Sequence, residues 1–150
     1  MPAYYLKADI ENFFVSINKD ILYAEIVKLV NQDWVLSLIH RIIYHDCRKR
    51  VILKVSKVGF KKLPRKKSLW FAPDNQGLPI GNLTSQFFSN VYLNVLDQYI
   101  KHRWRCKYYC RYVDDFIILD KDPHKLNEIH KDLTRFLKER LKLFTKLIFK

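Results

Sequence analysis

The stretch Tyr108-Tyr109-Cys110-Arg111-Tyr112-Val113-Asp114-Asp115-Phe116-Ile117-Ile118-Leu119 decides the fold. Two runs rich in apolar residues flank a short acidic interruption, a pattern typical of two strands joined by a tight hairpin. The hairpin would place Asp114 and Asp115 at its tip. Adjacent carboxylates repel each other and stay ionised together only where solvent or a cation compensates their charge. The pair therefore indicates a divalent metal, although acids in a solvated turn explain the same pattern.

A third carboxylate strengthens the metal interpretation. Asp9 closes the apolar run Tyr4–Ala8, so it also lies at the end of a predicted strand. If the two strands are neighbours, three acids meet. Mg²⁺ prefers a few carboxylates, waters and substrate phosphates, and two ions about 3.5 to 4 Å apart can hold both the attacking and the leaving oxygen of a phosphoryl transfer. The acids therefore predict a polyphosphate substrate.

Three segments resemble the palm motifs of reverse transcriptases, in the order found in that family. They are Asp9–Ile17, Gly77–Gln86 and Tyr112–Asp115, and the resemblance extends from Tyr4 to Leu143. It implies an α+β fold, the polymerase palm, in which a split β-α-β arrangement packs helices on one face of an antiparallel sheet. It also implies one palm domain over residues 1–150, without the upstream part of the fingers and without a thumb.

The resemblance assigns catalytic roles to Asp9, Asp114 and Asp115. These acids, with the carbonyl of Ile10, would hold two Mg²⁺ or Mn²⁺ ions. Phe14 would lie beneath the incoming sugar and select deoxynucleotides. Alternatively, Phe13 and Phe14 both belong to the core, but the alternation of a pleated strand should send adjacent side chains to opposite faces.

The second motif is expected to contact the nucleotide and the template. Gly77 and Gly81 would allow close backbone approach, and Ile80 would face the nascent base pair. Family members from retroviruses and introns usually carry Gln where this chain has Ile80. Ile80-Gly81-Asn82 followed by Ser85-Gln86 resembles the bacterial enzymes of diversity-generating retroelements, and retron and intron types remain alternatives.

Three further side chains have open roles. Tyr112 could pack against the primer end, and Ser85 and Gln86 could touch the template, but helix or sheet packing explains them equally well. A fourth, Lys146, lies where the family often has a Lys that acts as an acid toward pyrophosphate. The segment Leu143–Lys150 lacks the usual Asn-Pro-Lys pattern, so this role is in doubt.

Net charge points to a polyanionic partner. The chain has 28 Lys and Arg against 15 Asp and Glu, a net charge of +13. Ten basic residues and no acid lie between Arg48 and Lys67. The apolar residues between them predict a strand pair, and the alternative is a solvated loop. The residues expected to contact nucleic-acid phosphates are Arg48, Lys49, Arg50, Lys61, Lys62, Arg65, Lys66 and Lys67.

The other sequence features indicate a soluble cytoplasmic protein. No run approaches the ~20 apolar residues of a membrane span, and Asp9 and Glu11 interrupt the only apolar stretch near the amino terminus. Three cysteines make no disulfide framework, which favours a reducing compartment. A zinc site at His102, Cys106 and Cys110 is disfavoured because no fourth ligand has a suitable spacing.

Periodicity predicts the remaining elements. Apolar stripes indicate helices over 21–30, 34–43, 83–103 and 123–138, and a final strand over 141–149. Asn82 or Thr84 would cap the third of these helices, and Pro123 would lie in the first turn of the fourth.

The expected activity is RNA-directed DNA polymerisation, with an RNA template, a DNA or RNA primer and deoxynucleoside triphosphates as partners. An accessory protein and a homodimer through exposed palm surface are left open as further partners. Two other function classes compete with polymerisation. One is a nucleic-acid-binding module without catalysis, and the other is a self-associating fragment that covers its apolar surface by dimerisation.

Overall fold

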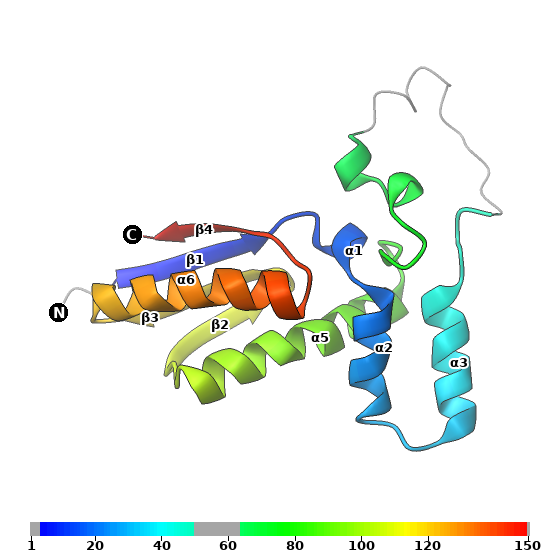
Figure 1. Ribbon diagram of the computed structural model, residues 1–150, viewed down its shortest axis with the longest axis horizontal. Coiled ribbons are helices and arrows are strands. Elements are labelled where there is room, and N and C mark those ends of the chain that lie inside the picture. The colour runs from blue at the N-terminus through cyan, green and yellow to red at the C-terminus, as the bar shows by residue number, and fades with distance from the viewer. Residues whose placement is uncertain (1–3, 50–63, 150) are drawn as a thin grey trace.

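The computed structural model describes residues 4–49 and 64–149. Four antiparallel strands form one sheet in the order β2-β3-β1-β4 (Figure 1). The strands are β1 Tyr4–Ile10, β2 Tyr108–Tyr112, β3 Asp115–Asp120 and β4 Thr145–Phe149. The central strand β1 pairs with β3 on one side and with β4 on the other, so the first and third motifs become neighbours.

One face of the sheet is buried and the other is open. Along β1, Leu6, Ala8 and Ile10 are buried, whereas the intervening Lys7 and Asp9 are exposed. Such alternation is what a strand of period 2 requires when only one of its faces meets the core. Asp9 therefore lies on the open face.

The longer helices are α2 Lys19–Val27, α3 Asp33–Tyr44, α5 Leu83–Gln98 and α6 Pro123–Arg140. Helix α6 packs against β1, β3 and β4 on the buried face, whereas α2 and α3 lie beyond the end of the sheet, where α2 packs against α5 and α3 (Figure 1). The core residues of α6 recur every three or four positions, which places them on one side of the helix. They are Leu126, Ile129, Leu133 and Leu137, all fully buried. The predicted α+β palm, with its helices on one face of an antiparallel sheet, is confirmed.

Tyr92 joins three parts of this core. Its buried hydroxyl donates a hydrogen bond to the carbonyl of Leu141 at 2.6 Å and accepts one from the backbone N–H of Asn18 at 3.4 Å. Burial raises the pKa of Tyr92 to about 12. Helix α5 is thereby tied both to the start of α2 and to the end of α6.

Several local predictions need correction. Residues Phe13–Ser16 form the short helix α1, because Asn12 adopts a left-handed conformation (φ 50°) and ends the strand. Strand alternation therefore does not govern Phe13 and Phe14. In the β2–β3 hairpin only Val113 and Asp114 lie between the strands, and Asp115 begins β3.

The boundaries of the later elements also differ from expectation. Strand β4 begins at Thr145 rather than at residue 141, because Leu141 and Leu143 fill the core on the way from α6. The helix predicted over 83–103 is continuous, but its last part, η3 Tyr99–Arg103, widens into a π-helix. Asn82 is the residue before α5, and its side chain makes no capping hydrogen bond. Pro123 does open α6, where Asp122 accepts a hydrogen bond from the N–H of His124 at 2.9 Å.

No helix within residues 4–49 and 64–149 has the combination of length and apolar character that crossing a membrane requires.

Candidate active site

Acids of the first and third motifs face each other at one end of the two central strands, on the open face. Asp9 of β1 lies directly opposite Asp115 of β3 in the antiparallel register. Tyr112 of β2 is opposite Asp115 on the other side, and Lys146 of β4 is opposite Asp9. Directly opposed residues in a sheet have Cβ atoms about 5 Å apart. The row Tyr112, Asp115, Asp9, Lys146 thus crosses the whole sheet.

Asp114 lies in the hairpin loop beside this row. Its pKa is raised above the ordinary carboxyl value, chiefly by burial and further by the negative charges of Asp9 and Asp115. A like charge raises a carboxyl pKa only when it is near. The negative charges of Asp9 and Asp115 therefore lie near enough to act on Asp114.

The backbone before Asp114 is strained. Val113 has a φ of 55°, a conformation that a β-branched residue rarely adopts. Residues held in such conformations cost of order 1–3 kcal/mol and persist only where their surroundings fix them. Here Nη1 of Arg111 donates a hydrogen bond to the carbonyl of Val113 at 2.8 Å.

Arg111 is itself held by Asp97, a half-buried acid of α5. Its Nε and Nη2 donate to the two carboxylate oxygens of Asp97 at 2.8 and 2.7 Å. Tyr109 donates to the same carboxylate at 2.6 Å, and Arg111 also reaches the side-chain oxygen of Asn90 at 3.2 Å. This network, which the sequence did not predict, connects the acidic hairpin to the helix beneath the sheet.

The carboxylates fit Mg²⁺ or Mn²⁺ in the chemistry of their donors. A hard divalent cation takes oxygen ligands, and it would relieve the repulsion from Asp9 and Asp115 that adds to burial in raising the pKa of Asp114. Within residues 4–49 and 64–149, no three His, Cys, Asp or Glu side chains are already arranged as a metal-binding set. The carboxylate oxygens therefore suit a divalent cation chemically, but they are not already arranged as a complete set of ligands.

The two aromatic residues after β1 differ in their environment. Phe13 is buried in the core at 2% exposure, whereas Phe14 is half-buried, with its ring centroid 5.4 Å from that of Phe13. The carbonyl of Phe14 accepts a hydrogen bond from the N–H of Leu78 at 2.8 Å. This bond fixes the first motif against the second.

The glycines of the second motif have different surroundings. Gly77 is buried with a φ of 84°, and a Cβ there would come within 2.3 Å of the Leu69 side chain. Its close neighbours are thus parts of this chain. Gly81 has a φ of 99° and is exposed with open space around it, so a ligand could approach its backbone.

The side chains around Gly81 also divide between surface and core. Ile80 is 76% exposed and Gln86 is exposed, whereas Ser85 is buried at 3%. Burial of Ser85 favours the helix-packing interpretation of this residue. Ile80 and Gln86 are accessible to nucleic acid.

A set of ion pairs and hydrogen bonds that the sequence did not predict holds the loop that leads into the second motif. Arg48 forms ion pairs with Asp46 and Asp74 and donates to the carbonyl of Ala72 at 2.9 Å. The buried Lys19 donates to the carbonyl of Asp74 at 3.0 Å, and burial lowers the pKa of this Lys. The guanidinium of Arg48 is therefore already engaged by two acids and a carbonyl of this chain.

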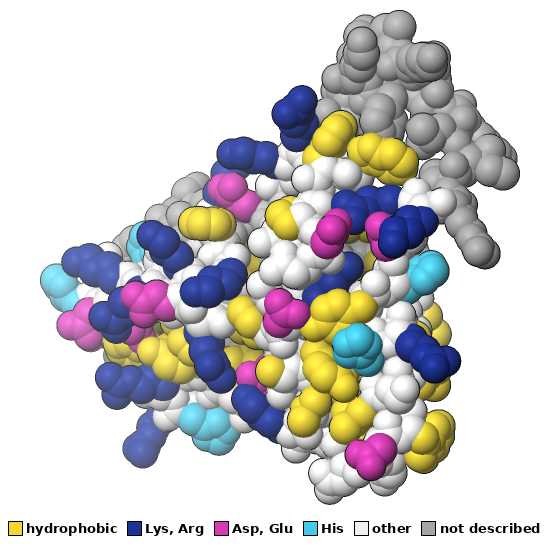
Figure 2. Space-filling view, turned by 45° about the vertical axis from the view of Figure 1, so that its right-hand side comes forward, with side chains coloured by type: hydrophobic (Ala, Val, Ile, Leu, Met, Phe, Trp, Pro, Cys, Tyr) yellow, Lys and Arg dark blue, Asp and Glu magenta, His cyan; other side chains and the backbone are white. Residues whose placement is uncertain are grey.

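The rest of the basic segment is partly described. Lys49 is exposed, and Arg65, Lys66 and Lys67 are exposed in the short 3-10 helix η1 Arg65–Lys67. Arg50, Lys61, Lys62 and the predicted strand pair lie outside the described residues. On the face shown in Figure 2, Lys and Arg side chains are spread over much of the described surface.

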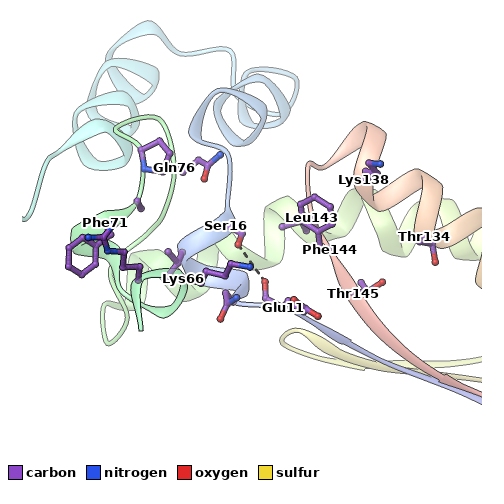
Figure 3. A pocket seen from close by; sticks show the side chains of 15 residues that line it. Glu11, Ser16, Lys66, Phe71, Gln76, Thr134, Lys138, Leu143, Phe144 and Thr145 are labelled. Atoms are coloured by element: carbon purple, nitrogen blue, oxygen red, sulfur yellow. Dashed lines mark hydrogen bonds between the residues drawn. The ribbon is translucent and has the colours of Figure 1, made fainter. Parts of the chain in front are cut away.

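A cavity of ≈660 Å³ lies beside the carboxyl end of β1. Figure 3 shows Glu11 and Ser16 on one side of it, Lys66 and Phe71 on another, and Lys138 and Thr145 across from them. Arg65 also lines the cavity, with its guanidinium 5.5 Å from the ring centroid of Phe71.

Thr145 contributes a buried hydroxyl that has no hydrogen-bond partner among the described residues. Glu11 lies 3.9 Å from the ammonium of Lys146.

Comparison with known proteins agrees with this architecture. The fold resembles that of apo telomerase from Candida tropicalis truncated from the C-terminal domain, with a TM-score of 0.63 and 15% sequence identity. The similarity covers all of this chain and 31% of the telomerase chain. At this identity the likeness concerns the fold alone. A comparison with curated proteins gave no match.

The sequence itself matches a family model over residues 1–146, almost its full length. The family is described as reverse transcriptase (RNA-dependent DNA polymerase). The matched region contains Asp9, Asp114 and Asp115 and all four strands except the end of β4. The chain therefore belongs to the reverse transcriptase family.

Proposed function

We propose that this chain is the palm of an RNA-directed DNA polymerase and that Asp9, Asp114 and Asp115 are its catalytic residues. The observation that carries the proposal is the pairing of Asp9 with Asp115 across β1 and β3, with Asp114 near enough for both charges to raise its pKa. Family membership makes nucleotidyl transfer the reaction that this acidic site supports best.

The proposed metal ligands are the three carboxylates and the carbonyl of Ile10. Two bound Mg²⁺ or Mn²⁺ ions would lower the pKa of the primer 3′ hydroxyl and stabilise the charge that develops on the triphosphate. Asp9 and Asp115 would bind from opposed positions on two strands, which limits their relative movement. The Arg111–Val113 hydrogen bond would orient Asp114 toward the same point.

The cavity beside Glu11 is the proposed place for the incoming deoxynucleoside triphosphate. It starts two residues after Asp9, and Arg65, Lys66 and Lys138 supply positive charge around it. Phe14, half-buried on α1, remains the proposed residue beneath the sugar. Gly77 would act indirectly, because its packing against Leu69 sets the path of the loop.

The template and primer are proposed to lie across the open face. Tyr112, 81% exposed beside Asp115, would contact the primer end. Ile80, Gly81 and Gln86 would approach the template or the nascent pair, with Ser85 packed beneath them. Lys49, Arg50, Lys61, Lys62, Arg65, Lys66 and Lys67 would contact phosphates.

We further propose that the enzyme is of the diversity-generating retroelement type. Ile80 supports this assignment, since it is exposed at the position where a Gln could hydrogen-bond and an Ile can contribute only shape. Shape alone discriminates weakly between substrates, so low fidelity is part of the proposal. Retron and intron types are the alternatives.

A second candidate function is self-association without catalysis. Trp34, Leu38 and Ile42 are 72%, 51% and 40% exposed and recur every four residues, which places them on one face of α3. An accessory protein or a second copy of the chain could cover this face. A mass measurement in solution tests whether a second copy of the chain binds there.

The direct test of function is extension of a labelled primer on an RNA template by a protein that contains this chain. Extension is expected to require deoxynucleotides and Mg²⁺ or Mn²⁺. Asp9→Asn should slow it by roughly 10²- to 10⁴-fold, since a lost metal ligand removes several kcal/mol of transition-state stabilisation. Asp33→Asn, which changes an acid in the first turn of α3, is the matched control and should extend normally. Extension that survives Asp9→Asn would contradict the proposal, and a wild-type chain that binds RNA but never extends a primer would favour the non-catalytic module.

A further inference from the structure

A second exposed surface lies at the end of the β2–β3 hairpin that is remote from the acids. We call it the distal surface, and it consists of Arg105, Lys107, Tyr108, Leu119 and Lys121. Together with Asp120 and Lys125, these residues line a cavity of ≈480 Å³. This volume is within the range of about 300–1,000 Å³ found for small-molecule sites, and it suits one nucleotide of a longer strand.

The distal surface carries uncompensated positive charge. Lys125 is paired with Asp120 at 2.6 Å, and this pair holds the pKa of Asp120 below its ordinary value. Among the described residues, Arg105, Lys107 and Lys121 form no ion pair with any acid. Three cations around one cavity are a binding surface for phosphate groups.

The floor of the cavity is apolar and aromatic. Tyr108 is 57% exposed and Leu119 is 37% exposed, and the two are directly opposed on neighbouring strands. The ammonium of Lys107 lies 5.4 Å from the ring centroid of Tyr108. An exposed aromatic ring beside cations is the combination by which proteins bind single strands, since the ring stacks a base and the cations contact the flanking phosphates.

The distal surface shares the open face with the catalytic acids. Residues at alternate positions of a strand point to the same face, so Leu119 and Asp115 of β3 are on one side of the sheet. Four residues of strand separate them by about 13 Å. A stacked strand with about 3.4 Å per nucleotide would cover that distance in about four nucleotides.

The backbone at this end is also held in an unusual conformation. Arg105 has a φ of 50°, one of four residues other than glycine with a positive φ in the described ranges. Two of the others, Asn12 and Val113, are next to the proposed catalytic segments. The left-handed turn at Arg105 brings the chain from η3 to the start of β2, so that Arg105 and Lys107 line the same cavity.

We propose that the distal surface binds single-stranded nucleic acid, with a base stacked on Tyr108 and flanking phosphates contacted by Arg105, Lys107 and Lys121. This site is separate from the acids and requires neither metal nor nucleotide. It would hold a strand that enters or leaves the open face. Because a paired base cannot stack on Tyr108, the surface selects single strands over duplexes.

The test is binding of labelled oligouridine and oligothymidine in EDTA, measured by fluorescence anisotropy over a range of salt concentrations. Tyr108→Leu should weaken binding about fivefold or more, because stacking of even one base is lost, while the salt dependence stays unchanged. Tyr108→Phe keeps the ring and should bind as the wild type does. Phe87→Leu is the matched control, since Phe87 is 63% exposed on α5, and it should have no effect.

Charge is tested with a second pair of variants. Lys107→Gln/Lys121→Gln should reduce the slope of log affinity against log salt by about 1.4, or about 0.7 for each lost contact. Lys28→Gln/Lys131→Gln removes the same charge from two exposed positions, one directly after α2 and one on α6, and should change the slope less.

The outcomes separate the proposal from non-specific attraction. Equal slopes for the two double variants, or equal losses for Tyr108→Leu and Phe87→Leu, would overturn it. The proposal would also be overturned if Tyr108→Leu weakened the binding of a duplex as much as it weakened the binding of a single strand. Binding of oligouridine alone would identify RNA as the ligand, and equal binding of both strands would identify a site for either nucleic acid. Thermal unfolding of each variant verifies that the protein remains folded.

Discussion

Asp114→Asn is expected to raise the stability of the metal-free chain and to abolish its stabilisation by Mg²⁺ or Mn²⁺. The pKa of Asp114 is raised in the folded state by burial and by the charges of Asp9 and Asp115. Between the ordinary carboxyl pKa and this raised value, the folded state binds more protons than the unfolded state. Stability therefore falls as pH increases through that window, and the loss persists at neutral pH. Asn carries no charge, so the variant does not lose this stability as the pH rises.

Metal binding should make the wild type more stable than Asp114→Asn. A ligand at a hundred times its dissociation constant stabilises the folded state by about 2.7 kcal/mol, and only the wild type should gain this. The affinity of the wild type for Mn²⁺ should also fall as pH is lowered through the raised pKa of Asp114, because protons compete with the metal.

Thermal unfolding in EDTA and in a Mn²⁺ titration measures both effects, and Asp33→Asn again serves as the control. A lower melting temperature for Asp114→Asn in EDTA, together with a Mn²⁺ shift equal to that of the wild type, would remove Asp114 from the site.

Arg111→Met should destabilise the chain by up to about 3 kcal/mol, because it leaves the half-buried carboxylate of Asp97 without its cationic partner and with only the hydrogen bond from Tyr109. The side chains of Arg111 and Asp97 are 11% and 18% exposed, and two hydrogen bonds join them. Arg111→Lys keeps the charge but cannot reproduce the forked contact or reach Val113 at the same time. It should fold with a smaller loss of stability and still bind Mn²⁺ more weakly.

The double variant Arg111→Met/Asp97→Asn makes the test specific. Removing both charges eliminates the unpaired carboxylate, so the double variant should be more stable than Arg111→Met alone. Metal affinity should remain low in the double variant, because the carbonyl of Val113 has still lost its donor. Chemical denaturation and calorimetry would show this separation. If Mn²⁺ affinity recovered with stability, Arg111 would support the fold without positioning the hairpin.

The sequence predicted the parts of the fold that local periodicity and family motifs specify. The apolar run Tyr4–Ala8 and the helical pattern over 123–138 are local, and both led to the correct kind of element. That Asp9 and Asp115 are neighbours followed from the resemblance to the family. Their exact register did not, since it depends on how β1 aligns with β3.

The interactions that sequence reasoning missed are side-chain contacts between distant residues. Asp97 and Arg111 lie on different elements, and no spacing rule relates them. The same is true of Arg48 and Asp74, so Arg48 was expected to contact phosphates although the structure gives it two acidic partners. Phe14 shows that strand alternation fails as a guide where the chain leaves the strand. The left-handed turn at Asn12 ends β1, so Phe14 lies on a short helix.

The most direct measurement of the central claim is a nuclear magnetic resonance map of Mn²⁺ binding to the isotope-labelled chain. At a low ratio of metal to protein, the paramagnetic ion broadens only the amide signals near its site. The acids of β1 and β3 are expected to act as one site, so the signals of Asp9, Ile10 and residues 113–116 should disappear first and should persist in Asp114→Asn. Broadening that begins instead around Asp46 and Asp74, or that is identical in Asp114→Asn, would contradict the account.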